Sequence, residues 1–213
     1  MPEQYGGFPT KSNIFVQVIQ GSVRDREEAR RTWERWATEI APEGIGWLAS
    51  TAGFSDGEFI AVVTFASGEA VRRNSQRPEQ DEWWREMERH FSGDVTIQDC
   101  ETVATYGAWE RQDAGFVQII QGWSRDLDGM MDEIAKTEQE FVRDHQLGLV
   151  GGIIADHGDG NFTEVIYYPT EDDARAADQE EAQKPVGAAE KLSQTASDIR
   201  YLFLRDPMLH HHV

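Results

Sequence analysis

The sequence predicts an α+β fold in which one chain holds two copies of the same unit, packed sheet against sheet. Three observations lead to this prediction. A strand-like segment recurs 101 residues further along, the expected elements follow the same order in both halves, and several expected strands are too continuously apolar to have one face in water.

The repeated segment is FVQVIQG at residues 15–21 and FVQIIQG at residues 116–122, with a single Val-to-Ile difference. Both copies are followed by an Arg-Asp pair, at Arg24-Asp25 and Arg125-Asp126. A match of this length at a fixed offset indicates a duplicated unit rather than coincidence. The remaining elements of the two halves should therefore correspond.

Each repeated strand is followed by an expected helix, because Asp25 or Asp126 can cap the first free backbone amides. In the first half, apolar residues three and four positions apart place one stripe on this helix, which should end at Pro42 and Gly44. In the second half a looser stripe passes through Met130, Ile134, Phe141 and Val142.

Two strands joined by a turn come next in each half, over residues 46–51 and 58–65 and over residues 149–155 and 161–168. A second helix should start at Ser67 or Thr170 and break before Pro78 or Pro185, because the residue before proline disfavours helical angles. It should resume over residues 79–91 and 186–195. A last strand over residues 95–99 or 199–204 closes each unit.

The order β-α-β-β-α-β folds as a four-stranded antiparallel sheet with both helices on one face, which leaves the other face bare. Continuous apolar runs at residues 59–63 and 150–155 indicate strands buried on both faces. We therefore expect units at 12–103 and 116–206 whose bare faces pack together, a linker at 104–115 and a tail at 207–213. This arrangement predicts a monomer with an internal pseudo-dimer, or a dimer of such chains.

Composition excludes several classes of protein. The 39 acidic residues outnumber the 20 basic ones, so a formal charge of −19 would repel phosphate backbones and anionic lipid. We expect neither nucleic acid nor membrane as a partner, since no apolar run reaches the roughly 18 residues of a membrane span. A single cysteine, Cys100, and the absence of a secretion signal at the start agree with a cytoplasmic protein.

The repeated strand, together with RNSQRPEQ at residues 73–80 leading to Trp83 and Trp84, resembles the dimeric α+β barrel (ferredoxin-like) superfamily, in particular its antibiotic biosynthesis monooxygenase-like group. The two halves would stand for the two subunits of the usual homodimer. The resemblance implies a ligand cavity between helices and sheet within a unit. Members of the superfamily include cofactor-independent monooxygenases, haem-degrading enzymes, decarboxylases and proteins without an assigned reaction.

The resemblance implies a small-molecule-handling protein, with cofactor-independent oxygenation of an aromatic or polyketide-like compound as the candidate reaction. Such a site excludes water and offers hydrogen bonds to a developing anion. The candidate catalytic residues are His90, as a base, and Asn74; the candidate substrate-binding residues are Gln17, Trp33, Trp83, Trp84 and Gln118. Haem is not expected, because Gln17 stands where the haem-degrading relatives have an Asn.

Each of these features also has a purely structural interpretation. The tryptophans can fill a core, the strand glutamines can bond between the two copies, and His90 can satisfy carbonyls at a helix end. Residues 156–159 (DHGD) occupy a hairpin turn without further ligands at suitable spacing, so no metal is expected. His210 to His212 are interpreted as part of the tail.

Two other function classes remain beside the enzyme. Tandem units of this kind also serve as non-catalytic sensors that bind small molecules, and the fold does not choose between the two. The RNA recognition motif shares the element order, and residues 57–65 (GEFIAVVTF) faintly resemble its aromatic strand. RNA binding would need an exposed sheet face and a basic surface, so it is rejected.

Overall fold

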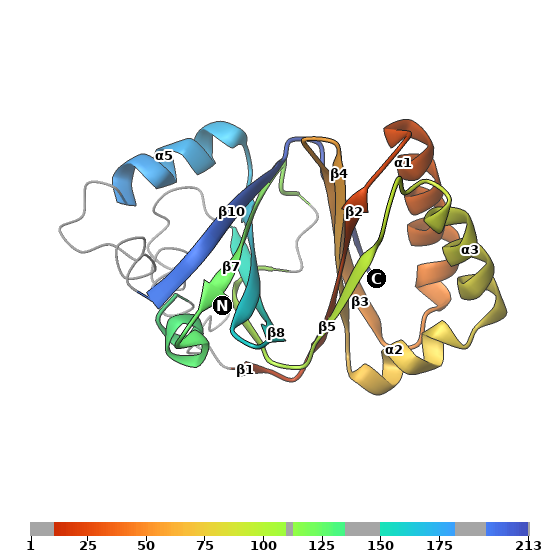
Figure 1. Ribbon diagram of the computed structural model, residues 1–213, viewed down its shortest axis with the longest axis horizontal. Coiled ribbons are helices and arrows are strands. Elements are labelled where there is room, and N and C mark those ends of the chain that lie inside the picture. The colour runs from red at the N-terminus through yellow and green to blue at the C-terminus, as the bar shows by residue number, and fades with distance from the viewer. Residues whose placement is uncertain (1–10, 110–112, 135–149, 182–194, 213) are drawn as a thin grey trace, which may run out of the picture.

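A computed structural model describes residues 11–109, 113–134, 150–181 and 195–212. Two antiparallel sheets face each other at its centre, and the helices cover their outer faces (Figure 1). The predicted fold class, two tandem ferredoxin-like units packed sheet to sheet, is confirmed.

The first unit begins with strand β2 (Phe15–Ser22), whose neighbours are β4 (Glu58–Phe65) and β5 (Thr96–Cys100). Strand β3 (Trp47–Ser55) pairs with β4 through the predicted hairpin turn, in which Asp56 and Gly57 have positive φ. Both residue types tolerate that conformation. The helices of this unit are α1 (Arg26–Arg35), α2 (Gly68–Ser75) and α3 (Pro78–Glu88), with the break before Pro78 where it was predicted.

The second unit repeats this plan with β7 (Phe116–Ser124), β8 (Gly151–Gly158), β9 (Asn161–Tyr168) and β10 (Ala196–Leu204). Residues 127–134 are helical, and α5 (Glu171–Glu181) follows β9. The predicted continuation of the first helix through Phe141 and Val142, and the predicted helix over 186–195 except for its last residue, lie outside the described residues.

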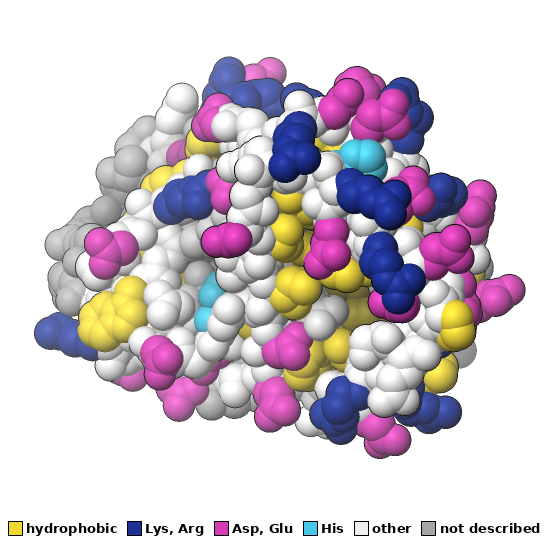
Figure 2. Space-filling model, turned by 45° about the vertical axis from the view of Figure 1, so that its right-hand side comes forward, with side chains coloured by type: hydrophobic (Ala, Val, Ile, Leu, Met, Phe, Trp, Pro, Cys, Tyr) yellow, Lys and Arg dark blue, Asp and Glu magenta, His cyan; other side chains and the backbone are white. Residues whose placement is uncertain are grey.

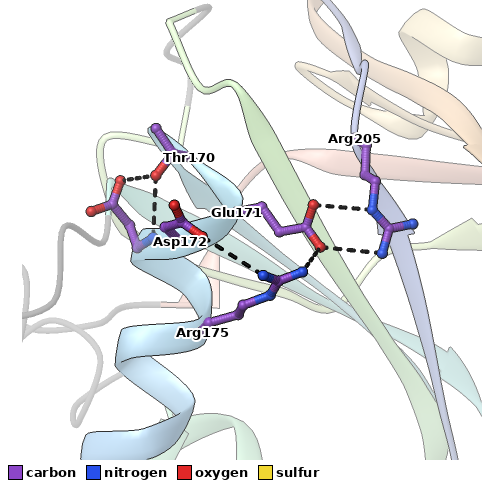
Figure 3. Close-up of polar contacts among 6 residues, drawn as sticks. Thr170, Glu171, Asp172, Arg175 and Arg205 are labelled. Atoms are coloured by element: carbon purple, nitrogen blue, oxygen red, sulfur yellow. Dashed lines mark hydrogen bonds and ion pairs between the residues drawn. The ribbon is translucent and has the colours of Figure 1, made fainter.

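Helix α5 is fixed at its start by its own cap and by the end of β10 (Figure 3). The Thr170 hydroxyl accepts from the Asp173 amide at 3.2 Å, as an N-cap residue does. Glu171 accepts hydrogen bonds from Arg205, at 3.0 and 3.2 Å, and from Arg175 at 2.8 Å. The bond from Arg205 is the main reason that the pKa of Glu171 is lowered.

Two further strands connect the units in a way that the sequence did not predict. Strand β6 (Val103–Gly107) follows the first unit but pairs with β8 of the second, and β11 (Met208–His211) follows the second unit but pairs with β3 of the first. Part of the segment interpreted as a linker, and most of the segment interpreted as a tail, are therefore strands of the two sheets. The short β1 (Lys11–Ser12) pairs with β6.

With these additions one sheet has the order β11-β3-β4-β2-β5 and the other the order β1-β6-β8-β9-β7-β10. Buried side chains from both sheets form one apolar layer between them, including Val16, Val18, Ile60, Val117 and Ile119. The bare faces are thus covered by each other, as expected from the continuous apolar runs. An RNA recognition motif binds RNA on the exposed face of its sheet. Here the corresponding face of each sheet is buried against the other sheet.

Candidate functional site

The candidate site lies in the first unit, between its helices and the outer face of its sheet. Asp25 caps the start of helix α1, and its carboxylate accepts from the amides of Glu27 and Glu28 at 3.0 and 3.1 Å. This start sets the rotation of the helix, so Trp33 faces the sheet and is 1% exposed. The chain then continues into a π-helical turn, η1 (Trp36–Ile40), in which Trp36 faces the same way. Such turns are frequent at functional sites.

Helix α3 brings the second group of rings. Pro78 occupies the first turn of the helix, where its missing N–H has no cost. Trp83 is buried against α1, and its indole N–H donates to the Thr32 carbonyl at 2.9 Å, which ties the two helices together. Arg35 and Glu86 form an ion pair at 2.5 Å between the same helices. Trp84, the next residue, is partly buried at the edge of this cluster.

The aromatic rings contact one another without filling the space. Ring centroids are 4.8 Å apart for Trp33 and Trp36, 5.4 Å for Trp36 and Trp83, and 5.9 Å for Trp36 and Trp47. Between these rings and the sheet lies a cavity of about 230 Å³. Its walls are lined by Gln17, Ile19, Trp33, Trp36, Ala41, Gly44, Trp47, Val63, Phe65, Val71, Asn74, Ser75, Arg77, Gln80, Asp81, Trp83, Trp84 and Ile97.

The surface of this part of the molecule is hollowed. Figure 2 shows hydrophobic side chains at depth on the face that the view brings forward, with acidic and basic side chains around them. Arg77 and Asp81 are the charged residues among the described walls of the cavity, and each is ion-paired, Arg77 with Glu79 at 2.8 Å and Asp81 with Arg85. The interior of the cavity is therefore mainly aromatic and aliphatic.

Solved structures with little sequence identity have the same fold. A "putative monooxygenase" from Lactobacillus acidophilus superposes with a TM-score of 0.74 at 14% identity, over 94% of this chain and 97% of that one. Another "putative monooxygenase", from Fusobacterium nucleatum, gives 0.72 at 10% identity, over 94% and 95%. An "anthrone oxidase-like protein" gives 0.63 at 12% identity, over 94% and 96%. The predicted resemblance is confirmed at the level of the fold.

No protein-family model and no curated protein matches the sequence. The solved structures are 10–14% identical to this chain, so they share its fold without indicating which of its residues act in a site. In the described residues no helix combines the length and the apolar character needed to cross a membrane.

Five of the seven residues predicted for the site line the cavity together: Gln17, Trp33, Asn74, Trp83 and Trp84. They come from β2, α1, α2 and α3, so only the tertiary fold brings them together. Gln17 donates to Asp99 at 2.8 Å. Whether any of them binds a substrate stays a prediction.

Asn74 is occupied by the backbone. Its amide oxygen accepts from the Ile45 N–H at 2.9 Å, and its amide nitrogen donates to the carbonyls of Ile45 at 2.8 Å and of Ala70 at 3.0 Å. The side chain thus holds the turn before β3 against α2. This geometry favours a positioning role over the predicted catalytic one.

His90 and Gln118 are not part of the cavity. His90 follows the last turn of α3, and its Nε2 lies 2.9 Å from the Thr32 hydroxyl. This placement does not support the predicted base, because the imidazole is engaged outside the cavity walls. Gln118 corresponds to Gln17 in the second unit and is 4% exposed on β7.

The sequence left open whether the strand glutamines contact a ligand or bond between the two copies, and the other pair, Gln20 and Gln121, bears on this. Gln121 donates to Gln20 at 2.9 Å, so the two equivalent residues bond to each other between the sheets. For this pair the interface explanation holds. In the hairpin at 156–159, His157 bonds to the Thr163 hydroxyl at 2.8 Å, and burial lowers its pKa. Within the described ranges no three His, Cys, Asp or Glu side chains are grouped to hold a metal.

Trp36, Trp47, Arg77 and Gln80 line the cavity but were not predicted as site residues. Trp36 had a signal in the sequence, since it lies three positions after Trp33 on the same helical stripe. Trp47 is one of the first-half tryptophans that together suggest an aromatic-lined pocket, but it begins a strand, so its place in the wall depends on the tertiary fold.

Proposed function

We propose that the first unit binds a small aromatic compound in this cavity and that the chain oxygenates it without a cofactor. The observation that carries the proposal is an aromatic-lined pocket that reaches from the surface into the core of the first unit. Small-molecule sites are typically concave and mostly apolar, with a few polar groups in the wall. The names of the structures that share the fold, two monooxygenases and an anthrone oxidase-like protein, support the same reaction class.

The reaction has modest requirements. An activated ring CH₂ is oxidised by four electrons as O₂ is reduced: one oxygen atom becomes the new carbonyl oxygen, and the other leaves as water with the two hydrogens of the CH₂ group. The chain's part is to exclude water, hold the ring and stabilise the anion from which oxygen takes an electron. Since the charged lining residues in the described part are both ion-paired, the substrate proton would pass to water at the mouth of the cavity.

Oxygen uptake with a panel of one- and two-ring hydroxyarenes and quinols tests the proposal. Two exposed isoleucines offer a matched pair of variants: Ile97 lines the cavity and is 45% exposed, whereas Ile45 does not line it and is 37% exposed. Ile97→Trp should lower kcat/KM at least about tenfold by narrowing the cavity, and Ile45→Trp should leave it within about twofold. His90→Ala should also retain turnover, because His90 is outside the cavity.

A non-catalytic binding protein is the second candidate. The observation in its favour is that His90 does not reach the cavity, so the first unit has no evident base there. Ligand binding that Ile97→Trp weakens, without oxygen uptake for any compound in the panel, would favour the binding protein. Equal turnover by wild type and Ile97→Trp would place the reaction elsewhere.

A further inference from the structure

A second cavity, the inter-unit cavity, lies at one end of the apolar layer between the two sheets. Its volume is about 710 Å³, and among the described residues it shares no lining residue with the cavity of the first unit. The inward-facing side chains become polar where the strands reach it; on β2, for example, Val16 and Val18 are followed by Gln20 and Ser22. Small-molecule sites are frequent in the mouths of β-barrels, which this position resembles.

The two copies contribute equivalent positions to the inter-unit cavity but different side chains. Ser22 of β2 corresponds to Trp123 of β7, and their strand neighbours Glu58 and Asn161 also correspond. In a homodimer, a cavity between equivalent strands of the two subunits would present each of these groups twice. The duplication removes that constraint, so the cavity is asymmetric and can fit an asymmetric ligand.

Trp123 gives the inter-unit cavity a fixed aromatic surface. Its side chain is 39% exposed, and its indole N–H donates to the Asp159 carbonyl at 2.7 Å. Gly160 leaves room for the ring, because a Cβ there would lie 2.7 Å from the indole nitrogen. Asn161 lines the cavity beside it, and its side-chain amide makes no hydrogen bond to the described ranges of the chain. The ring is therefore held in place with part of its surface open to a ligand.

The polar side chains of the inter-unit cavity comprise a bonded group and an unbonded group. Gln20 donates to Glu58 at 2.7 Å, and Glu58 also forms an ion pair with Arg200 of the other unit. Asp94 and Thr96, from the start of β5, make no side-chain hydrogen bond in the part of the chain that the structure describes. The first group fixes the shape of the cavity, and the second can bond to a ligand.

The charges of the lining disfavour an anionic ligand. Among the described lining residues, the charged ones are four carboxylates and one guanidinium: Glu58, Asp94, Asp159, Asp198 and Arg200. A fully hydrophobic ligand is also disfavoured, because it would cover these groups and the neighbouring amides without replacing their bonds to water.

A sugar combines the features that this lining requires. Each hydroxyl can both donate and accept, so it suits amides and carboxylates alike. The C–H groups on one face of a pyranose ring can pack on an indole. Since an apolar cavity of about 150 Å³ holds benzene, about 710 Å³ has room for one or two six-membered rings with their hydroxyls. We propose that the inter-unit cavity binds a mono- or disaccharide that is neutral or carries an amine, with one ring stacked on Trp123. This inference does not depend on the proposed function.

Titration of the full chain with glucosamine, glucose and glucuronate at pH 6.5, followed by NMR of the sugar protons, tests the inference. The three probes share one pyranose ring and carry a positive charge, no charge and a negative charge. Glucosamine should bind most tightly, and glucuronate should bind at least about tenfold more weakly than glucosamine. Failure of both glucosamine and glucose to bind would overturn the inference, and so would equal binding of glucuronate and glucosamine.

Cyclohexylamine distinguishes a sugar site from a site for organic cations. It keeps a six-membered ring and the positive charge of glucosamine but has no hydroxyls. Its dissociation constant should be at least about tenfold higher than that of glucosamine, because it cannot bond to the polar side chains of the cavity. Equal binding of the two amines would show that charge alone is recognised and would overturn the assignment to sugars.

Variants of exposed residues locate the binding site. Trp123→Ala should weaken glucose binding at least about tenfold, because it removes the stacking surface. Tyr201→Ala is the matched control: Tyr201 is 49% exposed on the neighbouring β10 and is not among the described lining residues, so its loss should change glucose binding less than about twofold. Equal losses in the two variants, or no loss in Trp123→Ala, would contradict the assignment.

Asp94→Asn provides a second test that does not depend on the folding of Trp123→Ala. The change removes one exposed charge and keeps the shape of the side chain. It should weaken glucosamine binding at least about threefold and leave glucose binding within about twofold. An unchanged ratio of the two dissociation constants would show that the amine does not lie near Asp94, and would overturn the preference proposed for amine-bearing sugars.

Discussion

Residues in the same cavity wall have different functions, and their hydrogen bonds distinguish them. Asn74 and Trp47 lie on either side of the turn at residues 44–46, and Gly46 has the positive φ of 64° that this turn requires. The Asn74 amide bonds both polar groups of the Ile45 backbone, whereas the Trp47 indole N–H has no partner in the described structure. Asn74 therefore places the turn from which Trp47 enters the cavity.

Asn74→Ala should lower the free energy of unfolding by about 1–3 kcal/mol, because it removes the two part-buried hydrogen bonds to the Ile45 backbone and the buried one to the Ala70 carbonyl. Urea denaturation measures the change. Ser75→Ala is the matched control, since its exposed hydroxyl bonds only the Arg72 carbonyl, and it should cost less than about 0.5 kcal/mol. A loss of oxygen uptake in Asn74→Ala without any loss of stability would restore a catalytic role.

At the scale of elements, each unit is completed by a strand from the other. Strand β11 contributes Met208, which is 2% exposed in the core of the first unit. On the same face of β11, the Nε2 atom of His210 lies 2.9 Å from the Oε2 atom of Glu34 in α1. In the second unit β6 contributes Tyr106, whose hydroxyl donates to the buried Glu164 at 3.1 Å. Gly152 makes this possible, because a Cβ there would lie 2.2 Å from the Tyr106 hydroxyl.

Met208→Ala should destabilise the protein by about 2–4 kcal/mol, because it leaves a cavity in the core of the first unit. Met208→Leu keeps the volume and should cost less than about 1.5 kcal/mol. Thermal or urea unfolding of the two variants measures the difference. If Met208→Ala is as stable as wild type, β11 contributes little to the core.

The sequence predicted the elements because local patterns determine them. Caps at Asp25, Ser67 and Thr170, and the helix break at Pro78, were found where the sequence indicated them. The exchange of β6 and β11 was not predicted, because a short strand's partner depends on which edge is free in the assembled fold. For the same reason the sequence could group the tryptophans but could not show which indoles lack an acceptor.

At the scale of the whole molecule, the two units share the apolar layer between their sheets, and polar contacts also join them. Gln20 and Gln121, which are equivalent in the repeat, bond to each other. The hydroxyls of Thr51 and Tyr167 lie 2.7 Å apart, buried between the two sheets. Arg200 of the second unit forms an ion pair with Glu58 of the first. We expect the units to unfold together, because separating them would expose the shared apolar layer.

A double-mutant cycle on Thr51 and Tyr167 measures the coupling across this interface. Tyr167→Phe should cost about 1–3 kcal/mol, because it leaves the Thr51 hydroxyl without its partner. Adding Thr51→Val should recover part of that loss, so the two changes are not additive. Urea denaturation of wild type, both single variants and the double variant gives the coupling energy. Strict additivity would show that the contact does not stabilise the interface.

The same interface should make the protein sensitive to alkali. Burial raises the pKa of Cys100 from 9.0 to about 12, and burial raises the pKa of Tyr167 from 10.0 to about 12. Each group ionises at a lower pH in the unfolded chain than in the folded one. The contribution of its neutral form to the stability of the fold is therefore complete below pH 9 for the Cys100 thiol and below pH 10 for the Tyr167 phenol. It is lost as the pH rises towards 12, by about 1 kcal/mol per pH unit for each group.

Urea unfolding at pH 8, 9.5 and 11 measures this loss, and Tyr167→Phe supplies the comparison. The variant should start less stable at pH 8 and lose less stability than wild type between pH 9.5 and 11, because Tyr167 no longer titrates. Parallel losses in the two proteins would mean that Tyr167 ionises as readily in the folded chain as in the unfolded one. In that case the space between the sheets admits water, and the shared layer is not the closed core on which the pairing of the two units depends.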